Sequence, residues 1–233
     1  MKTTRLLLTA LSLGSSLLSF LSYTLLLQQL GTSAQVDALF VAASVPVGMA
    51  GLLTAVLVYL LPTRLTELPP PPQEAALRQL ARWIWCATAV ALTIVPAASL
   101  HDGSGLAATM LFGFVLYAGV SVAGTLLVCR AQAAGRYLLA GLNQFLLVLG
   151  LVAGVLMAIN SQQVGWVVLG QLAGAIAALV ALARSLRLQG LLRVRPGADA
   201  AALRELMAPL RRHLPHILVA STAFTLFQPI DAY

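Results

Sequence analysis

Charge is scarce in this sequence. Asp, Glu, Lys and Arg together make up 9% of its 233 residues, whereas hydrophobic residues make up 60%. Soluble globular domains carry about 25% charged residues, so the composition excludes that class. The hydrophobic residues form continuous runs, and about 20 residues of helix cross the hydrocarbon core of a bilayer. The sequence therefore predicts an all-α polytopic membrane protein whose main partner is the lipid bilayer.

Cysteine and histidine are also rare, with two and three residues. Cys86 and Cys129 lie in separate apolar runs, so they form neither a disulfide framework nor a metal-binding spacing. His213 and His216 lack acidic or cysteine partners, and we interpret them as interfacial residues rather than a zinc site. The sequence also lacks a nucleophile with a base, a paired carboxylate site and a glycine-rich phosphate loop. We predict no catalytic residues, no metal and no cofactor, and thus not an enzyme.

Six apolar segments precede a basic segment and a seventh apolar run. We predict six membrane spans at residues 6–30, 38–61, 83–100, 106–129, 138–159 and 165–186. The first is too long for the apolar region of a signal peptide, which has about 7–15 residues. The predicted organisation is a six-helix transmembrane lobe over 1–186, a cytoplasmic basic linker with a short amphipathic helix over 187–213, and the start of a seventh helix over 214–233. Because the seventh run is still apolar at Tyr233, we expect the functional unit to be longer.

Prolines divide the first half of the chain. Pro46 lies near the middle of the second segment, which is expected to stop at Pro62. The four consecutive prolines Pro69–Pro72 predict a short, stiff polyproline spacer before the third segment. That segment is expected to kink or end near Pro96, because proline cannot donate the helical hydrogen bond.

The basic residues lie on one side of the predicted membrane spans. All 14 lysines and arginines lie at the N-terminus, in alternate connections between the predicted spans or, for Arg184, at the end of the sixth span next to such a connection. The intervening turns, 31–37, 101–105 and 160–164, contain none. The positive-inside rule places the basic connections in the cytoplasm, so we predict a multi-pass protein with a cytoplasmic N-terminus. This distribution accounts for the net charge of +7 without a nucleic-acid partner.

The first segment carries a polar stripe. Its members recur every three or four residues and therefore share one helix face. They are Ser12, Ser15, Ser16, Ser19, Ser22 and Tyr23. A serine stripe is typical of a tight helix–helix seam, but also of the wall of a water-filled cavity through which a polar group moves. The stripe alone favours neither interpretation. Asn143, Gln144 and Gln228 are further polar residues within apolar segments.

Glycine pairs mark two later segments. Gly150 and Gly154 in the fifth segment and Gly170 and Gly174 in the sixth each form a Gly-x-x-x-Gly motif. Such motifs allow two helix backbones to approach closely. We predict a structural contact there and no further role.

Two acidic residues lie beside or within apolar segments, Asp37 and Asp231. An ionisable group at membrane depth points to function, whereas Asp37 at the outer interface would equally cap the second segment. The candidate substrate or ion pathway from these patterns comprises Ser16, Ser19, Ser22, Asp37, Gln228 and Asp231.

The stretch 30–62 carries a resemblance to a known family. It contains Leu30-Gly31, a short turn, Val36-Asp37-Ala38-Leu39, the mid-segment Pro46 and the terminal Pro62. This order resembles the N-terminal signature of the MurJ/MviN family of lipid II flippases, in the multidrug/oligosaccharidyl-lipid/polysaccharide exporter superfamily. The connection Gln132-Ala133-Ala134-Gly135-Arg136-Tyr137 is similar to the family as well.

The resemblance implies a fold and a mechanism. The fold has 14 spans with a core of two six-helix lobes around a central cavity, of which this chain would supply the first lobe and the start of the second. The implied function is alternating-access transport of a lipid-linked glycan precursor, such as lipid II, to the outer leaflet of the bacterial plasma (inner) membrane. A coupling ion or the membrane potential would drive it.

The chain departs from the family at the residues that bind the diphosphate. Arginines that the family places in its first two spans fall here on Ser16, Ser22 and Ala50. A diphosphate buried without cationic partners is costly, so a second lobe would have to supply them or the cargo would differ. Two alternatives follow: an ion-coupled small-molecule or drug exporter of the same superfamily in which Asp37 exchanges protons, and a non-transporting membrane scaffold.

Overall fold

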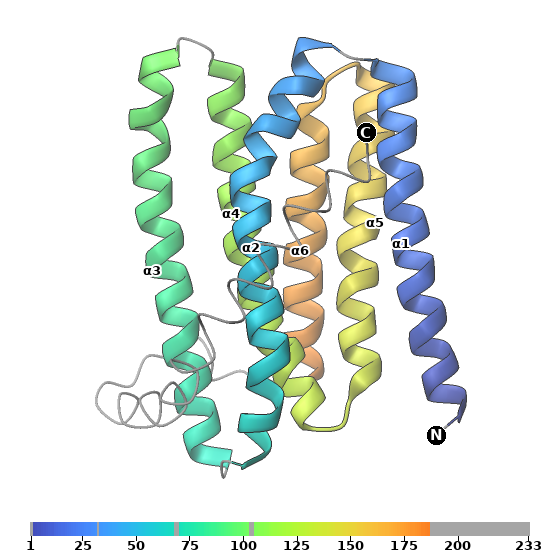
Figure 1. Ribbon diagram of the computed structural model, residues 1–233, viewed down its shortest axis with the longest axis vertical. Helices are drawn as coiled ribbons and strands as arrows, with labels where there is room; N and C mark the ends of the chain where they lie inside the picture. Colours follow the sequence, from blue (N-terminus) through green and yellow to red (C-terminus); the bar gives the residue numbers. More distant parts are fainter. Residues whose placement is uncertain (1, 32, 68–69, 103–104, 187–233) are drawn as a thin grey trace.

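Six α-helices run up and down in the computed structural model, which describes residues 2–31, 33–67, 70–102 and 105–186 (Figure 1). They are α1 (Lys2–Leu30), α2 (Ala34–Glu67), α3 (Pro70–Asp102), α4 (Gly105–Ala133), α5 (Tyr137–Ser161) and α6 (Gly165–Ser185). Consecutive helices are antiparallel because each connection is a short turn at one end of the bundle. The described residues contain no strand, which confirms the all-α prediction for this part of the chain.

Five of these helices are long and apolar enough to cross a membrane, namely α1, α2, α4, α5 and α6. They indicate a multi-pass membrane protein. The helix α3 is 33 residues long but is not among the five, so the count of six spans and a seventh stays a prediction. The linker 187–213, the run 214–233, and with them Gln228 and Asp231, lie outside the described residues.

The structure corrects the expectations drawn from proline. The helix α2 contains Pro46 as expected, but it continues through Pro62 to Glu67 instead of stopping there. The helix α3 continues through Pro96, so it does not end there, and a kink at this residue stays a prediction. The polyproline spacer is wrong for Pro70–Pro72, which form the first turn of α3. The reason is that the first N–H groups of a helix have no intrahelical acceptor, and the fixed φ of proline already suits a helix.

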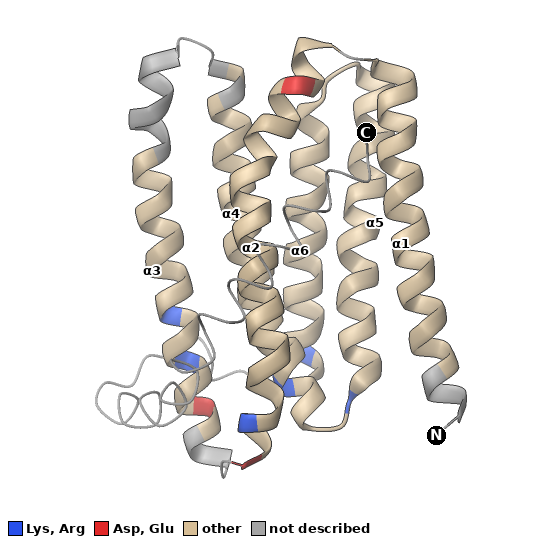
Figure 2. Cartoon of the chain, viewed as in Figure 1, with Lys and Arg blue, Asp and Glu red and all other residues tan. Residues whose placement is uncertain are grey.

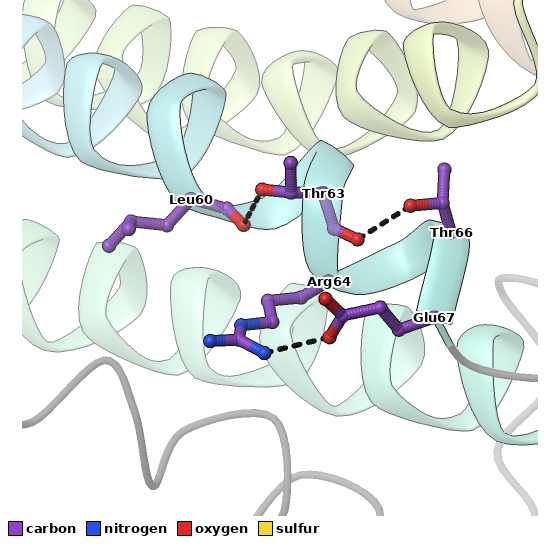
Figure 3. Close-up of polar contacts among 5 residues, drawn as sticks. All are labelled: Leu60, Thr63, Arg64, Thr66 and Glu67. Carbon is purple, nitrogen blue, oxygen red and sulfur yellow. Dashed lines mark hydrogen bonds and ion pairs between the residues drawn. The ribbon is translucent and has the colours of Figure 1, made fainter.

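Short polar contacts accompany the end of α2 beyond Pro62 (Figure 3). The Thr63 hydroxyl donates to the Leu60 carbonyl at 3.2 Å, and the Thr66 hydroxyl donates to the Thr63 carbonyl at 2.6 Å. Arg64 Nη1 and Glu67 Oε2 form an ion pair at 2.7 Å. Both side chains of the pair are exposed at the end of the bundle, where such pairs contribute little stability.

The α5–α6 contact confirms the prediction made from the glycine pairs. A Cβ added to Gly150 would lie 2.6 Å from the Gly174 Cα, and one added to Gly154 would lie 2.6 Å from the Trp166 carbonyl oxygen. A Cβ on Gly174 would likewise meet the Leu146 carbonyl oxygen at 2.8 Å. These neighbours are backbone atoms, so only glycine lets the two helices approach this closely.

The helix α4 occupies the middle of the bundle and packs against α2, α3, α5 and α6. Its residues from Val122 to Cys129 are all buried. The helix α1 packs mainly against α5, whereas α2 packs mainly against α4. Although α1 and α2 are consecutive, they make few direct contacts, and Figure 1 shows them separating below the turn that joins them.

Charged residues in the described part concentrate at one end of the bundle (Figure 2). Arg64, Arg130 and Arg184 lie in the last turns of α2, α4 and α6, and Arg136 precedes α5 at the same end. Asp37 lies in the first turn of α2, at the opposite end. The separation agrees with the predicted topology, and the cytoplasmic assignment of the basic end stays a prediction.

Candidate functional site

A cavity of about 260 Å³ lies inside the bundle, lined by α1, α2, α4, α5 and α6. It is not enclosed, and nine of its fifteen lining residues have polar side chains. The nine are Ser19, Tyr23, Thr54, Tyr117, Ser121, Thr125, Asn143, Gln144 and Gln171. None of the fifteen is charged. An uncharged polar cavity within apolar helices is the strongest candidate for a functional site in the described residues.

The cavity extends along the bundle axis. Gln171 lies six residues after the start of α6, and Asn143 lies six residues after the start of α5 at the opposite end. At 1.5 Å per residue, each is about 9 Å from its own end of the bundle. The polar lining therefore reaches from one half of the predicted membrane thickness into the other.

One part of the cavity centres on Gln171. Only 7% of this residue is exposed. Its Nε2 donates to the Tyr23 hydroxyl at 3.2 Å, and this hydrogen bond joins α6 to α1. Its Oε1 is buried and has no hydrogen-bond partner. A buried polar atom without a partner costs about 1–3 kcal/mol of folding free energy, so this amide destabilises the bundle. The ring of Tyr23 also contacts Phe40 of α2, with 6.2 Å between ring centroids.

Another part of the cavity joins α2 to α4. The hydroxyl oxygens of Thr54 and Thr125 are 3.2 Å apart, and Thr125 donates to the Ser121 carbonyl at 3.1 Å. Because Thr125 has only one hydroxyl proton, Thr54 is the donor in the contact between the two threonines. The Thr54 oxygen keeps its acceptor capacity toward the cavity that it lines.

The amide of Asn143 lies close to Gly124 of α4. A Cβ added to Gly124 would lie 3.6 Å from Asn143 Oδ1, so the side chain from α5 rests against the α4 backbone. The amide thus lies beside the buried centre of α4 while still lining the cavity.

The structure divides the serine stripe of α1. Ser15 and Ser22 are buried, and their hydroxyls donate to the Leu11 and Leu18 carbonyls at 2.7 Å. Ser19 and Tyr23 line the cavity, whereas Ser12 and Ser16 are exposed. The helix-seam interpretation therefore fits the buried Ser15 and Ser22, and the cavity-wall interpretation fits Ser19 and Tyr23. Of the predicted pathway residues, Ser19 lines the cavity, while Ser16 and Ser22 do not.

Asp37 lies apart from the cavity, exposed in the first turn of α2. The capping interpretation of this residue is wrong, because Ser33 occupies the capping position. The Ser33 hydroxyl accepts from the Val36 N–H at 3.4 Å, and the Ser33 carbonyl accepts from the Asp37 N–H at 3.0 Å. A carboxylate in the first turn still interacts favourably with the helix dipole.

Sequence reasoning missed Thr54, Tyr117, Ser121, Thr125 and Gln171. Thr54 and Gln171 are isolated polar residues in long apolar runs, whereas Tyr117, Ser121 and Thr125 recur every four residues in one segment and so share a helix face, a signal that could have found them. Gln171 carries a usable signal, since an amide in the interior of a predicted span is costly unless it finds partners. That the other four residues line the same cavity depends on which helices pack against each other, and the sequence does not show this.

A second space, of about 510 Å³, lies between α4 and α6 at the end of the bundle where both helices begin. Its lining is mostly apolar and includes Leu106, Phe112, Leu169 and Leu172. Gln35, Thr109 and Gln163 also line it, but its apolar lining is suited to lipid tails rather than to a polar ligand.

The described residues contain no group of three His, Cys, Asp or Glu side chains that could hold a metal ion. Comparisons of the whole chain with protein-family models, with curated proteins and with solved structures found no match. Membership of the MurJ/MviN family, which residues 30–62 resemble, is therefore a proposal.

Proposed function

We propose that this protein is a membrane transporter that moves a lipid-linked glycan precursor, of the lipid II kind, from the cytoplasmic to the outer leaflet by alternating access. The observation that carries the proposal is the uncharged polar cavity inside an apolar bundle. The resemblance of residues 30–62 to the MurJ/MviN signature supports the same class.

A purely structural role explains the cavity poorly. Polar groups in a membrane bundle stabilise it when they bond across helices, as Thr54 and Thr125 do. Gln171 instead keeps one buried amide atom without a partner. Polar side chains from five helices around one open space are what a polar molecule crossing the membrane requires.

The attachment of α1 and α2 supports the alternating-access part of the proposal. The two helices border the cavity but are fixed to different partners, α5 and α4. Pro46 interrupts the hydrogen bonds of α2 one turn before the cavity-lining Ala50 and Gly51. A bend at Pro46 would therefore move the wall of the cavity while the outer end of α2 stays in place.

A second candidate function is export of a small uncharged molecule, coupled to an ion. The cavity is slightly smaller than the range of about 300–1,000 Å³ typical of drug-sized ligands, and no cation lines it to pair with a diphosphate. Asp37 lies outside the cavity, so a coupling role for this acid would act at a distance from the cargo.

Depletion of the protein in its host tests the first function against the second. Outer-leaflet lipid II is measured with a membrane-impermeant enzyme that cleaves it in intact cells. Depletion is expected to reduce the cleavable fraction, and re-expression of the wild type to restore it. Unchanged outer-leaflet lipid II, together with increased sensitivity to small toxic compounds, would instead favour the small-molecule exporter. If neither property changes, both transport functions are wrong and the scaffold alternative gains support.

A further inference from the structure

We propose that the cavity binds the uncharged, hydroxyl-bearing part of a membrane lipid, such as a sugar ring without phosphate, and that Gln171 is the residue that recognises it. The inference deepens the proposed function, on which it rests for the idea that the ligand is lipid-linked. Its central observation is a buried amide that needs one more hydrogen-bond partner.

The Gln171 amide limits the chemistry of the ligand. Its two polar atoms are exchangeable by rotation of the amide, and one of them bonds to Tyr23 in either orientation. The other atom then needs either a donor or an acceptor from the ligand. A hydroxyl group supplies both, whereas a metal cation can only bind to the oxygen and a phosphate oxygen can only accept from the nitrogen.

The remaining lining favours the same chemistry. The Thr54 oxygen is still able to accept a hydrogen bond, and Asn143 and Gln144 offer both donors and acceptors on the facing helix. Such alternating donors and acceptors complement the hydroxyl groups of a sugar. With no charged residue in the lining, a phosphate or a bare cation would be desolvated there without a counter-charge.

The position of the cavity explains why the ligand would be attached to a lipid. The cavity is open and bordered by α1 and α2, which make few contacts with each other. Beside it, α1 presents exposed apolar side chains such as Leu17 and Phe20, 60% and 67% exposed. A polar head can therefore enter from the bilayer between the two helices while its tail stays in an apolar environment.

Two pairs of variants test the proposal without relying on one substitution. Gln171→Leu removes the amide at similar volume, and Gln163→Leu makes the same change at an exposed glutamine outside this cavity. Gly51→Leu fills space in the cavity, because no atom lies within 4 Å of a Cβ added there. Gly48→Leu, one turn away on α2, has the same free space but does not line the cavity.

The probe is radiolabelled monoglucosyl diacylglycerol, compared with phosphatidylglycerol of the same acyl chains. Binding is measured by scintillation proximity on the natural full-length protein in phosphatidylcholine nanodiscs, with thermal midpoints recorded for every variant. The wild type, Gln163→Leu and Gly48→Leu are expected to bind the glucolipid alike and to prefer it to phosphatidylglycerol. Gln171→Leu is expected to lower its affinity about tenfold or more, the effect of losing one or two buried hydrogen bonds. Gly51→Leu is expected to lower it at least as much, because the leucine side chain occupies the space of the ligand.

Several results would overturn the proposal. Equal binding to all five proteins would show that the glucolipid does not enter the cavity, which would then hold water alone. A preference for phosphatidylglycerol would show that the site accepts a phosphate, and sodium-dependent stabilisation that Gln171→Leu removes, without glucolipid binding, would identify a cation site. If Gln171→Leu does not fold, Gly51→Leu and Gly48→Leu decide the question alone.

Failure of the proposed function is distinguishable from failure of this inference. If depletion leaves outer-leaflet lipid II unchanged but Gln171-dependent glucolipid binding persists, the cargo is wrong and the cavity assignment stands. If lipid II transport is lost on depletion but glucolipid binding is insensitive to Gln171→Leu and Gly51→Leu, only the cavity assignment is wrong.

Discussion

At the scale of single residues, hydroxyl groups in this bundle have two different roles. Ser15, Ser22 and Thr88 donate to carbonyls one turn earlier in their own helices and need nothing from a neighbour. Thr54 and Thr125 also bond to each other across two helices and face the cavity, while the Thr125 hydroxyl donates to the Ser121 carbonyl of its own helix. This pair links α2, a wall of the cavity, to the central helix α4, as does the Cys129 thiol, which donates to the Leu57 carbonyl at 3.5 Å.

The link between Thr54 and Thr125 is testable by a double-mutant cycle. Replacing each threonine by the isosteric valine, singly and together, is expected to give a coupling energy of about 0.6 kcal/mol, the average for hydrogen bonds across membrane helices. The free energy of unfolding is measured in mixed micelles. A matched cycle of Thr54→Val with Thr88→Val is expected to show no coupling, since Thr88 bonds within α3. Equal coupling in the two cycles would contradict the assignment of this hydrogen bond.

At the scale of helices, the α5–α6 pair depends on glycine where the backbones meet. Gly150→Ala places a Cβ 2.6 Å from the Gly174 Cα, and no rotamer change relieves a clash between backbone atoms. We expect this variant to lose about 1–3 kcal/mol of stability, as overpacked cores do. The thermal midpoint in detergent measures the effect.

The control for this prediction is Gly14→Ala on α1. A Cβ added to Gly14 meets no atom within 4 Å, and alanine has a higher helix propensity than glycine. Gly14→Ala should therefore leave the midpoint unchanged or raise it slightly. If Gly150→Ala and Gly14→Ala behave alike, the two helices do not approach as closely as the structure shows.

The helices and the glycine contact were predictable because they depend on local signals. Long apolar runs define the helices, and the spacing of Gly150 and Gly154 matches that of Gly170 and Gly174. The helix ends expected at Pro62 and Pro96 are wrong, because both residues lie within helices, and Pro70 begins a helix. Proline interrupts single hydrogen bonds, and an apolar environment favours continuing the helix around it.

The cavity was only partly predictable because it is a property of packing order. Ser19 and Asn143 stood out as polar residues in apolar segments, but nothing in the sequence places α1 beside α5 rather than α2. That order brings Tyr23 of α1 to Gln171 of α6, 148 residues later in the chain. Asp37 does not line the cavity, because it lies in the first turn of α2 at the end of the bundle.

At the scale of the whole molecule, the separation of charges predicts how the bundle sits in the membrane. In the described residues, the arginines lie at the end of the bundle that holds the α4–α5 turn, and the α5–α6 turn lies at the other end. Moving that basic end across an energised membrane would be unfavourable, so it should stay in the cytoplasm. The cavity would then have the Asn143 part on the cytoplasmic side and the Gln171 part on the outer side.

Cysteine labelling tests this orientation. In a background of Cys86→Ala and Cys129→Ala, Ser161→Cys introduces a thiol at the exposed α5–α6 end and Ala134→Cys introduces one in the exposed α4–α5 turn. A membrane-impermeant maleimide is expected to label the Ser161→Cys protein in intact cells, and the Ala134→Cys protein only after permeabilisation. The reverse result would invert the topology. The proposed outward transport would then have to begin at Gln171 and end at Asn143, so the same measurement also fixes which part of the cavity the cargo meets first.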